Sequence, residues 1–166
     1  MKPAGHTAVM ADRARGEVAG DSEQVKLWRA LEYFPSAPKA ARAGGELIHA
    51  IDPCPAGQWW GWDPACGLGH MAHGLSDYFE PVWATDIHDH GWEGQHGPPL
   101  DFLSPEADRI DSIDWIVTNP PFGKAMEFVQ AGLRRARRGV AILARTALLE
   151  SAARYPLFFG AAGVNG

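Results

Sequence analysis

The apolar residues of this chain fall into short runs of strand length and longer stretches with helical spacing. We expect strands at residues 58–62, 81–85, 100–103, 113–118 and 140–143, and residues 113–118 are apolar enough for a buried central strand. We expect helices at residues 39–51, 70–79 and 123–138, the last closed by Gly139. A short helix at residues 25–34 would end before Pro35. From residue 58 onward, strands and helices therefore alternate.

This alternation predicts an α/β fold, with a doubly wound, mostly parallel sheet flanked by helices on both faces. Sheets of this kind bind ligands at the carboxyl ends of their strands. Residues 87–99 are rich in His, Gly and Pro and predict a long irregular connection in place of a helix. Residues 1–22 lack apolar periodicity. We interpret them as a flexible leader and residues 23–166 as a single domain.

Composition narrows the class of protein. With 166 residues and 46% apolar types, the chain can form one compact domain with a real core. Its formal net charge of −5 gives no global signature of nucleic-acid binding, so any DNA contact must be local or come from a missing part. Cys54 and Cys66 have no partners at zinc-like spacing. Neither a signal segment nor a membrane span of roughly 20 apolar residues is present in the sequence, so a soluble cytoplasmic protein is expected.

The first candidate site is a glycine turn between a predicted strand and a predicted helix, Asp63-Pro64-Ala65-Cys66-Gly67-Leu68-Gly69. Two glycines let the backbone turn tightly and approach a ligand closely. Asp86 ends the next strand and could hold a ribose diol. The same pattern fits a nicotinamide cofactor, but Asp63 would repel a pyrophosphate and suits the cationic amino group of a methionine moiety. A turn that binds no ligand is the remaining alternative.

A weaker signal lies where a third strand would end, at Asp101 and Phe102. An acidic residue there can accept a hydrogen bond from an adenine amino group, and an aromatic ring can pack on the base. A surface aspartate beside a core phenylalanine would produce the same pattern.

The second candidate site is Asn119-Pro120-Pro121-Phe122, directly after the predicted central strand. Each proline disfavours the helical region for the residue before it, so Asn119 and Pro120 are held extended with fixed directions for their oxygens. Two rigid acceptors can bind an exocyclic amino group, draw its lone pair out of conjugation and stabilise the charge that develops on nitrogen. Phe122 offers a face for stacking a base. A plain turn is the alternative interpretation.

Together these motifs resemble those of the DNA amino-methyltransferases, whose cofactor motif is similar to Asp-Pro-x-Cys-Gly-x-Gly and whose catalytic motif is Asn/Asp/Ser-Pro-Pro-Tyr/Phe. Here they stand at residues 63–69 and 119–122. Their order is similar to that of the adenine-N6 enzymes, including those of phages and prophages, and the resemblance covers about residues 33–159. It implies a Rossmann-like class I methyltransferase fold, S-adenosyl-L-methionine as cofactor, and DNA as substrate, with the target adenine flipped from the duplex.

The resemblance also assigns site residues. Four would be catalytic: Asn119, Pro120, Pro121 and Phe122. Eleven would bind the cofactor: Phe34, Pro35, Asp63, Pro64, Cys66, Gly67, Gly69, Asp86, Ile87, Asp101 and Phe102. Residues 23–166 would form one catalytic domain that lacks the final strands and any target-recognition domain of the family.

Two departures from the family pattern keep alternatives open. Phe122 replaces the commoner Tyr, and Asn-Pro-Pro-Phe also occurs in enzymes that methylate RNA bases. An RNA base or a protein glutamine amide is therefore an alternative acceptor. The missing strands allow a non-catalytic cofactor-binding remnant, and a nicotinamide oxidoreductase is the third alternative.

Other polar clusters receive structural interpretations. We expect His88, His90 and His96, with Asp86 and Asp89, to form a solvated loop and no metal site. We expect a solvated helix end at Arg134, Arg135, Arg137 and Arg138, and we regard Lys124 as the better candidate for a phosphate contact. The tryptophans at positions 59, 60 and 62 are expected to be structural.

Overall fold

The computed structural model describes residues 38–53 and 58–150, which all belong to one compact unit, Phe34–Gly166. Several sequence predictions lie outside the described residues: the leader at 1–22, the helix at 25–34, the cofactor contacts of Phe34 and Pro35, and the context of Cys54. No helix within the described ranges is both long and apolar enough to cross a membrane.

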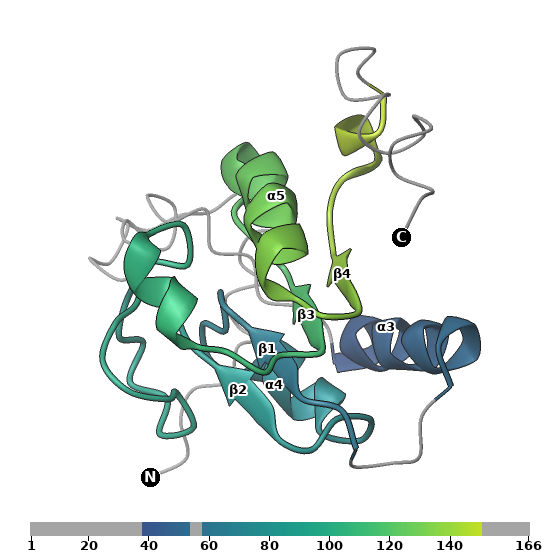
Figure 1. Ribbon diagram of the computed structural model, residues 1–166, viewed down its shortest axis with the longest axis horizontal. Helices are drawn as coiled ribbons and strands as arrows, with labels where there is room; N and C mark the ends of the chain where they lie inside the picture. Colours follow the sequence, from purple (N-terminus) through teal and green to yellow (C-terminus); the bar gives the residue numbers. More distant parts are fainter. Residues whose placement is uncertain (1–37, 54–57, 151–166) are drawn as a thin grey trace, which may run out of the picture. The chain divides into compact units, whose positions relative to one another are not determined.

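The described part of the chain contains a four-stranded sheet in which every pairing is parallel (Figure 1). Its strands are β1 (Gly61–Asp63), β2 (Val82–Ala84), β3 (Trp115–Thr118) and β4 (Gly139–Ile142), in the order β2-β1-β3-β4. The predicted α/β architecture with a parallel sheet is therefore confirmed. Because all strands run the same way, the residues that follow β1, β2 and β3 meet at one edge.

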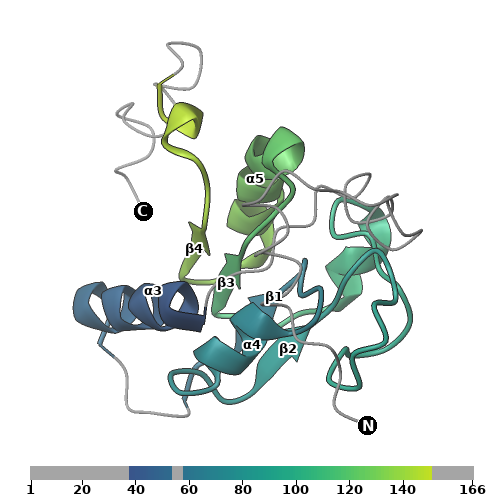
Figure 2. The same cartoon turned by 180° about the vertical axis from the view of Figure 1, so that it is seen from behind.

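Helices cover both faces of this sheet. Figure 1 shows α5 (Ala125–Arg135) in front of the strands, whereas α3 (Pro38–Ile51) and α4 (His70–Leu75) lie in front when the molecule is seen from behind in Figure 2. The alternation of side chains along β3 divides the core accordingly. Trp115 and Val117 pack with residues of α3 and α4, and Ile116 packs with residues of α5.

The strand predicted at residues 100–103 is absent, which corrects the sequence analysis. Phe102 and Leu103 form a turn that leads into η1 (Pro105–Arg109). His96 instead pairs with the backbone groups on the open edge of β2. Its backbone N–H donates to the Ala84 carbonyl at 2.7 Å, and its Nδ1 accepts from the Ala84 N–H at 3.1 Å. Prolines 98 and 99 have no N–H with which to continue a ladder.

Two helices are shorter than predicted. Helix α4 ends at Leu75, because the Tyr78 and Phe79 N–H groups both bond to the Leu75 carbonyl and close the turn. Helix α5 starts at Ala125, after a separate turn η2 (Phe122–Lys124), and Ala136 is already extended. The irregular connection predicted at residues 87–99 is confirmed, since these residues form turns and bends only.

Arginines at the end of α5 and directly after it anchor neighbouring segments. The expectation of a solvated helix end is wrong for Arg135, whose side chain is only 9% exposed, whereas Arg137 and Arg138 are exposed although they form contacts. Arg138 binds both carboxylate oxygens of Asp52 and lies 4.5 Å above the Trp59 ring, which ties the start of β4 to α3. Arg135 donates to the Phe102 carbonyl at 2.8 Å and pairs with Asp108. The Arg137 guanidinium donates to the Ser112 hydroxyl, and Arg134 is exposed.

Two of the three tryptophans expected to be structural are buried. As predicted, Trp59 and Trp62 are buried, whereas Trp60 is 43% exposed.

Candidate functional site

The glycine turn after β1 is fastened to the end of β2 by backbone hydrogen bonds. The Thr85 N–H donates to the Asp63 carbonyl at 2.9 Å, and the Cys66 N–H donates to the Thr85 carbonyl at 3.0 Å. The Gly67 N–H then donates to Asp86 Oδ2 at 2.9 Å. Gly67 has a φ of 53°, in the left-handed region that favours glycine. The predicted turn and the acidic residue of the next strand are therefore in direct contact.

Gly69 has a different role from the one predicted. Its φ of 78° requires glycine, but the space beside its Cα is filled by the Trp92 indole. A Cβ at this position would lie 2.3 Å from two atoms of that ring. At Gly69 the close approach is therefore made by a side chain of the His-rich loop, and this packing fixes the loop against the start of α4.

Asp63 ends β1 and is completely buried. Its Oδ1 accepts a 2.8 Å hydrogen bond from the Thr118 hydroxyl and a longer one, 3.4 Å, from the Ala65 N–H. Its Oδ2 is buried and has no hydrogen-bond partner among the residues that the structure describes. The pKa of Asp63 is raised to about 7, chiefly by burial and to a smaller extent by the charge of Asp86, against the lowering effect of those hydrogen bonds. An unsatisfied buried carboxylate oxygen costs free energy, and a donor or cation bound there would recover it.

Asp86 follows β2, is buried, and accepts hydrogen bonds on both oxygens. In addition to the Gly67 bond on Oδ2, its Oδ1 accepts from the His88 N–H at 3.0 Å, and His90 Nε2 lies 3.4 Å from the same oxygen. The next residue, Ile87, is 56% exposed. Pro64 and Cys66 are buried in the turn, and burial raises the pKa of the Cys66 thiol.

The prediction for Phe102 is wrong. Its ring is 1% exposed and packs between Trp62 and Phe128, with centroid distances of 5.1 and 4.8 Å. Because these core side chains enclose the ring, Phe102 has no exposed face on which a base could stack.

Asp101 is exposed, and its Oδ1 accepts a hydrogen bond from the Leu103 N–H at 2.9 Å. The Leu100 N–H bonds to the Asp86 carbonyl, so Asp101 follows a residue held at the end of β2.

The Asn-Pro-Pro-Phe segment begins where β3 ends. Asn119 is half-buried, Pro120 is buried, and the backbone at Pro121 is extended, with φ −52° and ψ 131°. The Pro121 carbonyl accepts from the Lys124 N–H at 2.9 Å, which closes the η2 turn. Phe122 is half-exposed, and the Arg145 guanidinium lies 4.4 Å above its ring centroid.

The two candidate sites meet at the Thr118–Asp63 hydrogen bond. The strands β1 and β3 are neighbours in the sheet, so the residue before Asn119 bonds to the first residue of the glycine turn. Residues 63–69, 86 and 118–122 therefore lie along adjacent strand ends. A buried hydroxyl inside an apolar run was the signal in the sequence, but only the pairing of β1 with β3 identifies its partner.

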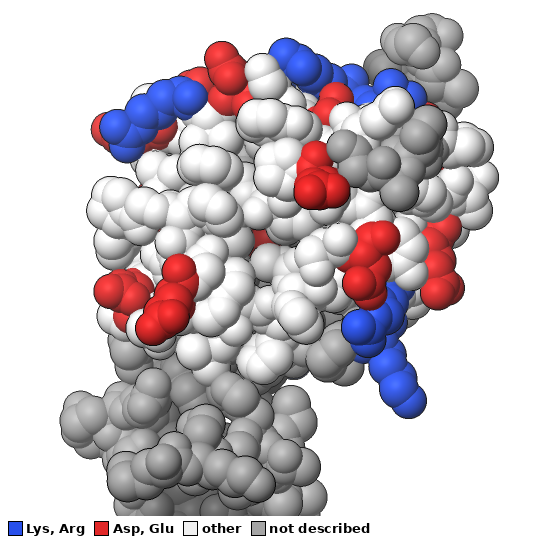
Figure 3. Space-filling model, turned by 90° about the horizontal axis from the view of Figure 1, so that it is seen from below, with Lys and Arg blue, Asp and Glu red and all other residues white. Residues whose placement is uncertain are grey.

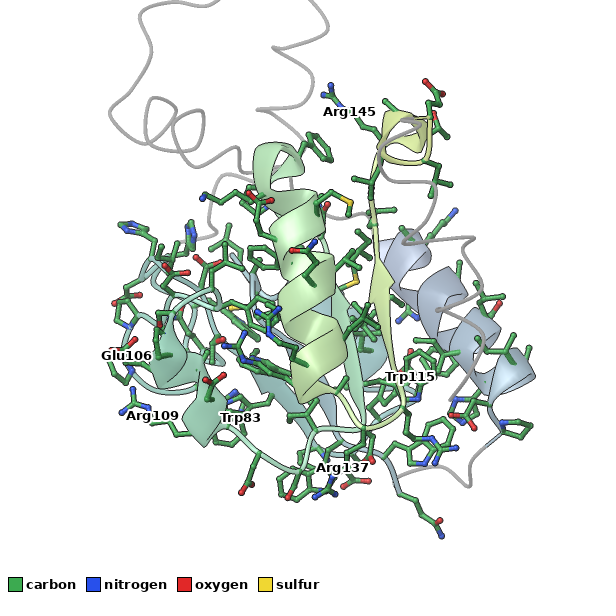
Figure 4. All side chains as sticks on the ribbon, turned by 45° about the horizontal axis from the view of Figure 1, so that its top comes forward. Trp83, Glu106, Arg109, Trp115, Arg137 and Arg145 are labelled. Atoms are coloured by element: carbon green, nitrogen blue, oxygen red, sulfur yellow. The ribbon has the colours of Figure 1, made fainter. Side chains whose placement is uncertain are left out.

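Positive charge near this edge comes from Lys124 and Arg145, both exposed. Neither forms an ion pair with an acidic side chain of residues 38–53 or 58–150. Figure 4 shows Arg145 beyond the carboxyl end of β4, at the opposite end of the sheet from Arg137. Figure 3 shows the side away from the carboxyl end of β4, where the described lysines and arginines lie at the margins and most of the described surface is uncharged. The described residues include no group of three or more His, Cys, Asp and Glu side chains arranged to hold a metal ion.

Comparison of the chain with protein-family models and with curated protein sequences found no match.

Proposed function

We propose that this chain is a Rossmann-like class I methyltransferase that transfers a methyl group from S-adenosyl-L-methionine to the N6 amino group of adenine in DNA. The observation that carries the proposal is the hydrogen bond between Thr118 and Asp63, because it brings the Asn-Pro-Pro-Phe segment beside the acidic glycine turn. A cofactor segment and an amino-acceptor segment at one strand edge are what methyl transfer to nitrogen requires.

The turn residues suit this cofactor. The unpartnered Oδ2 of Asp63 fits the ammonium of a methionine moiety, and that positive charge would favour the ionised carboxylate. Asp86 lies one strand away and could accept from ribose hydroxyls, and the exposed Ile87 beside it could pack on an adenine ring. A pyrophosphate would place negative charge beside Asp63, which argues against the nicotinamide alternative. When bound, S-adenosyl-L-methionine supplies the activated methyl group.

The chain's own residues would prepare the acceptor nitrogen. The Asn119 side-chain oxygen and the Pro120 carbonyl would each accept one hydrogen from the planar amino group, which removes its lone pair from conjugation. The same oxygens would stabilise the positive charge that develops on nitrogen. The fixed φ of two successive prolines limits how far these acceptors can move.

Arg145 and Phe122 favour a nucleic-acid base over a protein amide. The Phe122 ring is half-exposed and carries the Arg145 cation 4.4 Å from its centroid, and an aromatic ring paired with a cation is a common element of sites where bases stack. Arg145 and Lys124 supply positive charge at this edge of a chain whose net charge is −5. The phosphates next to a target base would bind these positive charges, whereas a glutamine side chain in a protein brings no phosphate with it. The same contacts would suit an RNA base, which is the second candidate acceptor.

Tritiated methyl transfer to DNA lacking adenine methylation, to RNA and to protein tests the proposal. We expect transfer to DNA that falls at least about 100-fold in Asn119→Ala, because one of two acceptors is lost. Gln130→Ala, an exposed amide on α5, is the matched control and should keep full activity. Calorimetry should show that Asn119→Ala still binds S-adenosyl-L-methionine. Binding with no Asn119-dependent transfer would identify a cofactor-binding remnant, and transfer to RNA alone would replace the acceptor.

A further inference from the structure

The Asp86 carboxylate is covered by a histidine from its own loop. His90 Nε2 lies 3.4 Å from Asp86 Oδ1, and the side chains of the pair are only 4% and 10% exposed. The His90 ring is itself supported by the His88 ring, edge-on at a centroid distance of 5.0 Å. His90 therefore occupies the approach to Oδ1.

The acceptor sites of the two oxygens are unequally filled. A carboxylate oxygen can accept about two hydrogen bonds. Oδ1 accepts a hydrogen bond from the His88 N–H at 3.0 Å, and His90 Nε2 lies 3.4 Å from the same oxygen and covers it. Among residues 38–53 and 58–150, Oδ2 accepts only from the Gly67 N–H, which leaves one of its acceptor sites for a ligand. A vicinal diol donates one hydrogen bond to each oxygen, and it can reach Oδ1 only if His90 leaves.

The backbone next to His90 gives the side chain a means of leaving. Gly91 has a φ of 73°, and a Cβ built on it would meet no atom within 4 Å. The Gly91 N–H donates to Asp89 Oδ1 at 2.7 Å, in a local turn on the exposed side of the loop. Open space therefore borders the backbone at Gly91, although the His90 side chain itself is only 4% exposed.

We propose that His90 is a specificity-determining residue of the cofactor site, which holds Asp86 Oδ1 until a ribose diol displaces it. This inference rests on the proposed function and adds a residue to it. A ligand with both ribose hydroxyls displaces His90 and gains a second hydrogen bond. A ligand that lacks one hydroxyl leaves His90 in place. His90 thus makes binding depend on the complete diol.

Calorimetry on the full chain at pH 7.5 tests the proposal with S-adenosylhomocysteine and its 2′-deoxy and 3′-deoxy analogues. His90→Ala should tighten S-adenosylhomocysteine about fivefold, because the competing partner of Oδ1 is gone. The tightening should be lost with at least one deoxy analogue. His90→Gln keeps a donor and should bind like the wild type, and His73→Ala, an exposed histidine on α4, is the matched control. Equal changes with all three ligands, or weaker binding to His90→Ala, would overturn the role of His90.

A measurement on the wild type covers the case in which His90→Ala does not fold. The ring resonances of His90, assigned by their absence from His90→Gln, should move when S-adenosylhomocysteine saturates the protein, and unmoved resonances would overturn the proposal. The two proposals fail separately. Absence of S-adenosylhomocysteine binding to the wild type refutes the cofactor assignment together with this inference, whereas binding without coupling to His90 refutes this inference alone.

Discussion

The Thr118 hydroxyl donates a 2.8 Å hydrogen bond to Asp63 Oδ1, and both side chains are fully buried. Thr118 is the last residue of β3 and Asp63 the last of β1, so the bond joins the ends of two adjacent parallel strands. It orients a carboxylate whose other oxygen has no hydrogen-bond partner within the described part of the chain, and it holds the residue before Asn119 in place.

Replacement of Thr118 by Val should destabilise the fold. The change keeps the shape of the side chain but leaves Asp63 with one long hydrogen bond from Ala65, so we expect a loss of about 1–3 kcal/mol in the free energy of unfolding. Thr118→Ser retains the hydroxyl and should lose less. Urea denaturation of the three proteins measures both effects. Equal stability of Thr118→Val and the wild type would mean that the bond does not support Asp63.

Asp63 should make stability depend on pH. Its pKa in the fold is about 7, above the ordinary value of 3.8, so between about pH 4 and 7 the folded protein binds more protons than the unfolded chain. The free energy of unfolding should therefore fall as pH rises through this window, by on the order of 1 kcal/mol per pH unit, and level off above about pH 7.

Asp63→Asn should remove this slope, and urea denaturation from pH 4.5 to 8 measures it. Asp101→Asn changes an exposed carboxyl and is the control that should retain the slope. A wild-type curve parallel to that of Asp63→Asn would show that Asp63 does not titrate in this range.

Gly69→Ala should cost more than Gly91→Ala, although both glycines have left-handed backbones with φ of 78° and 73°. The strain common to both is about 1–2 kcal/mol. At Gly69 the new methyl would also meet the Trp92 ring, which adds about 1–3 kcal/mol, whereas at Gly91 the space is open. Thermal or urea unfolding measures the difference. In the Gly69→Ala/Trp92→Ala double variant the added cost should disappear, and strict additivity would argue against this contact.

Arg145→Ala should weaken nucleic-acid binding and change its salt dependence. If Arg145 contacts one phosphate, the slope of log affinity against log salt should shrink by about 1. Fluorescence anisotropy with a labelled single-stranded oligonucleotide measures the slope. Arg134→Ala, an exposed arginine on α5, should leave it unchanged. Identical slopes for Arg145→Ala and the wild type would remove the support that Arg145 gives to a nucleic-acid acceptor.

Local patterns in the sequence determined much of this protein. Alternating strand and helix periods predicted the parallel α/β sheet, and the order of residues 63–69, 86 and 119–122 placed both candidate segments after strands. Each of these features depends on residues only a few positions apart. Glycine at position 67 permits the positive φ of the turn, and each proline restricts the backbone of the residue before it.

Only the tertiary structure decided what fills each position. Phe102 is a core residue because Trp62 and Phe128, distant in sequence, surround it, and residues 100–103 form no strand because His96 already satisfies Ala84. The partners of Thr118 and Arg138 are 55 and 86 residues away in the chain. Hydrogen bonds and packing between residues so far apart depend on strand order and register, and the hydrophobic period of a single segment does not encode them.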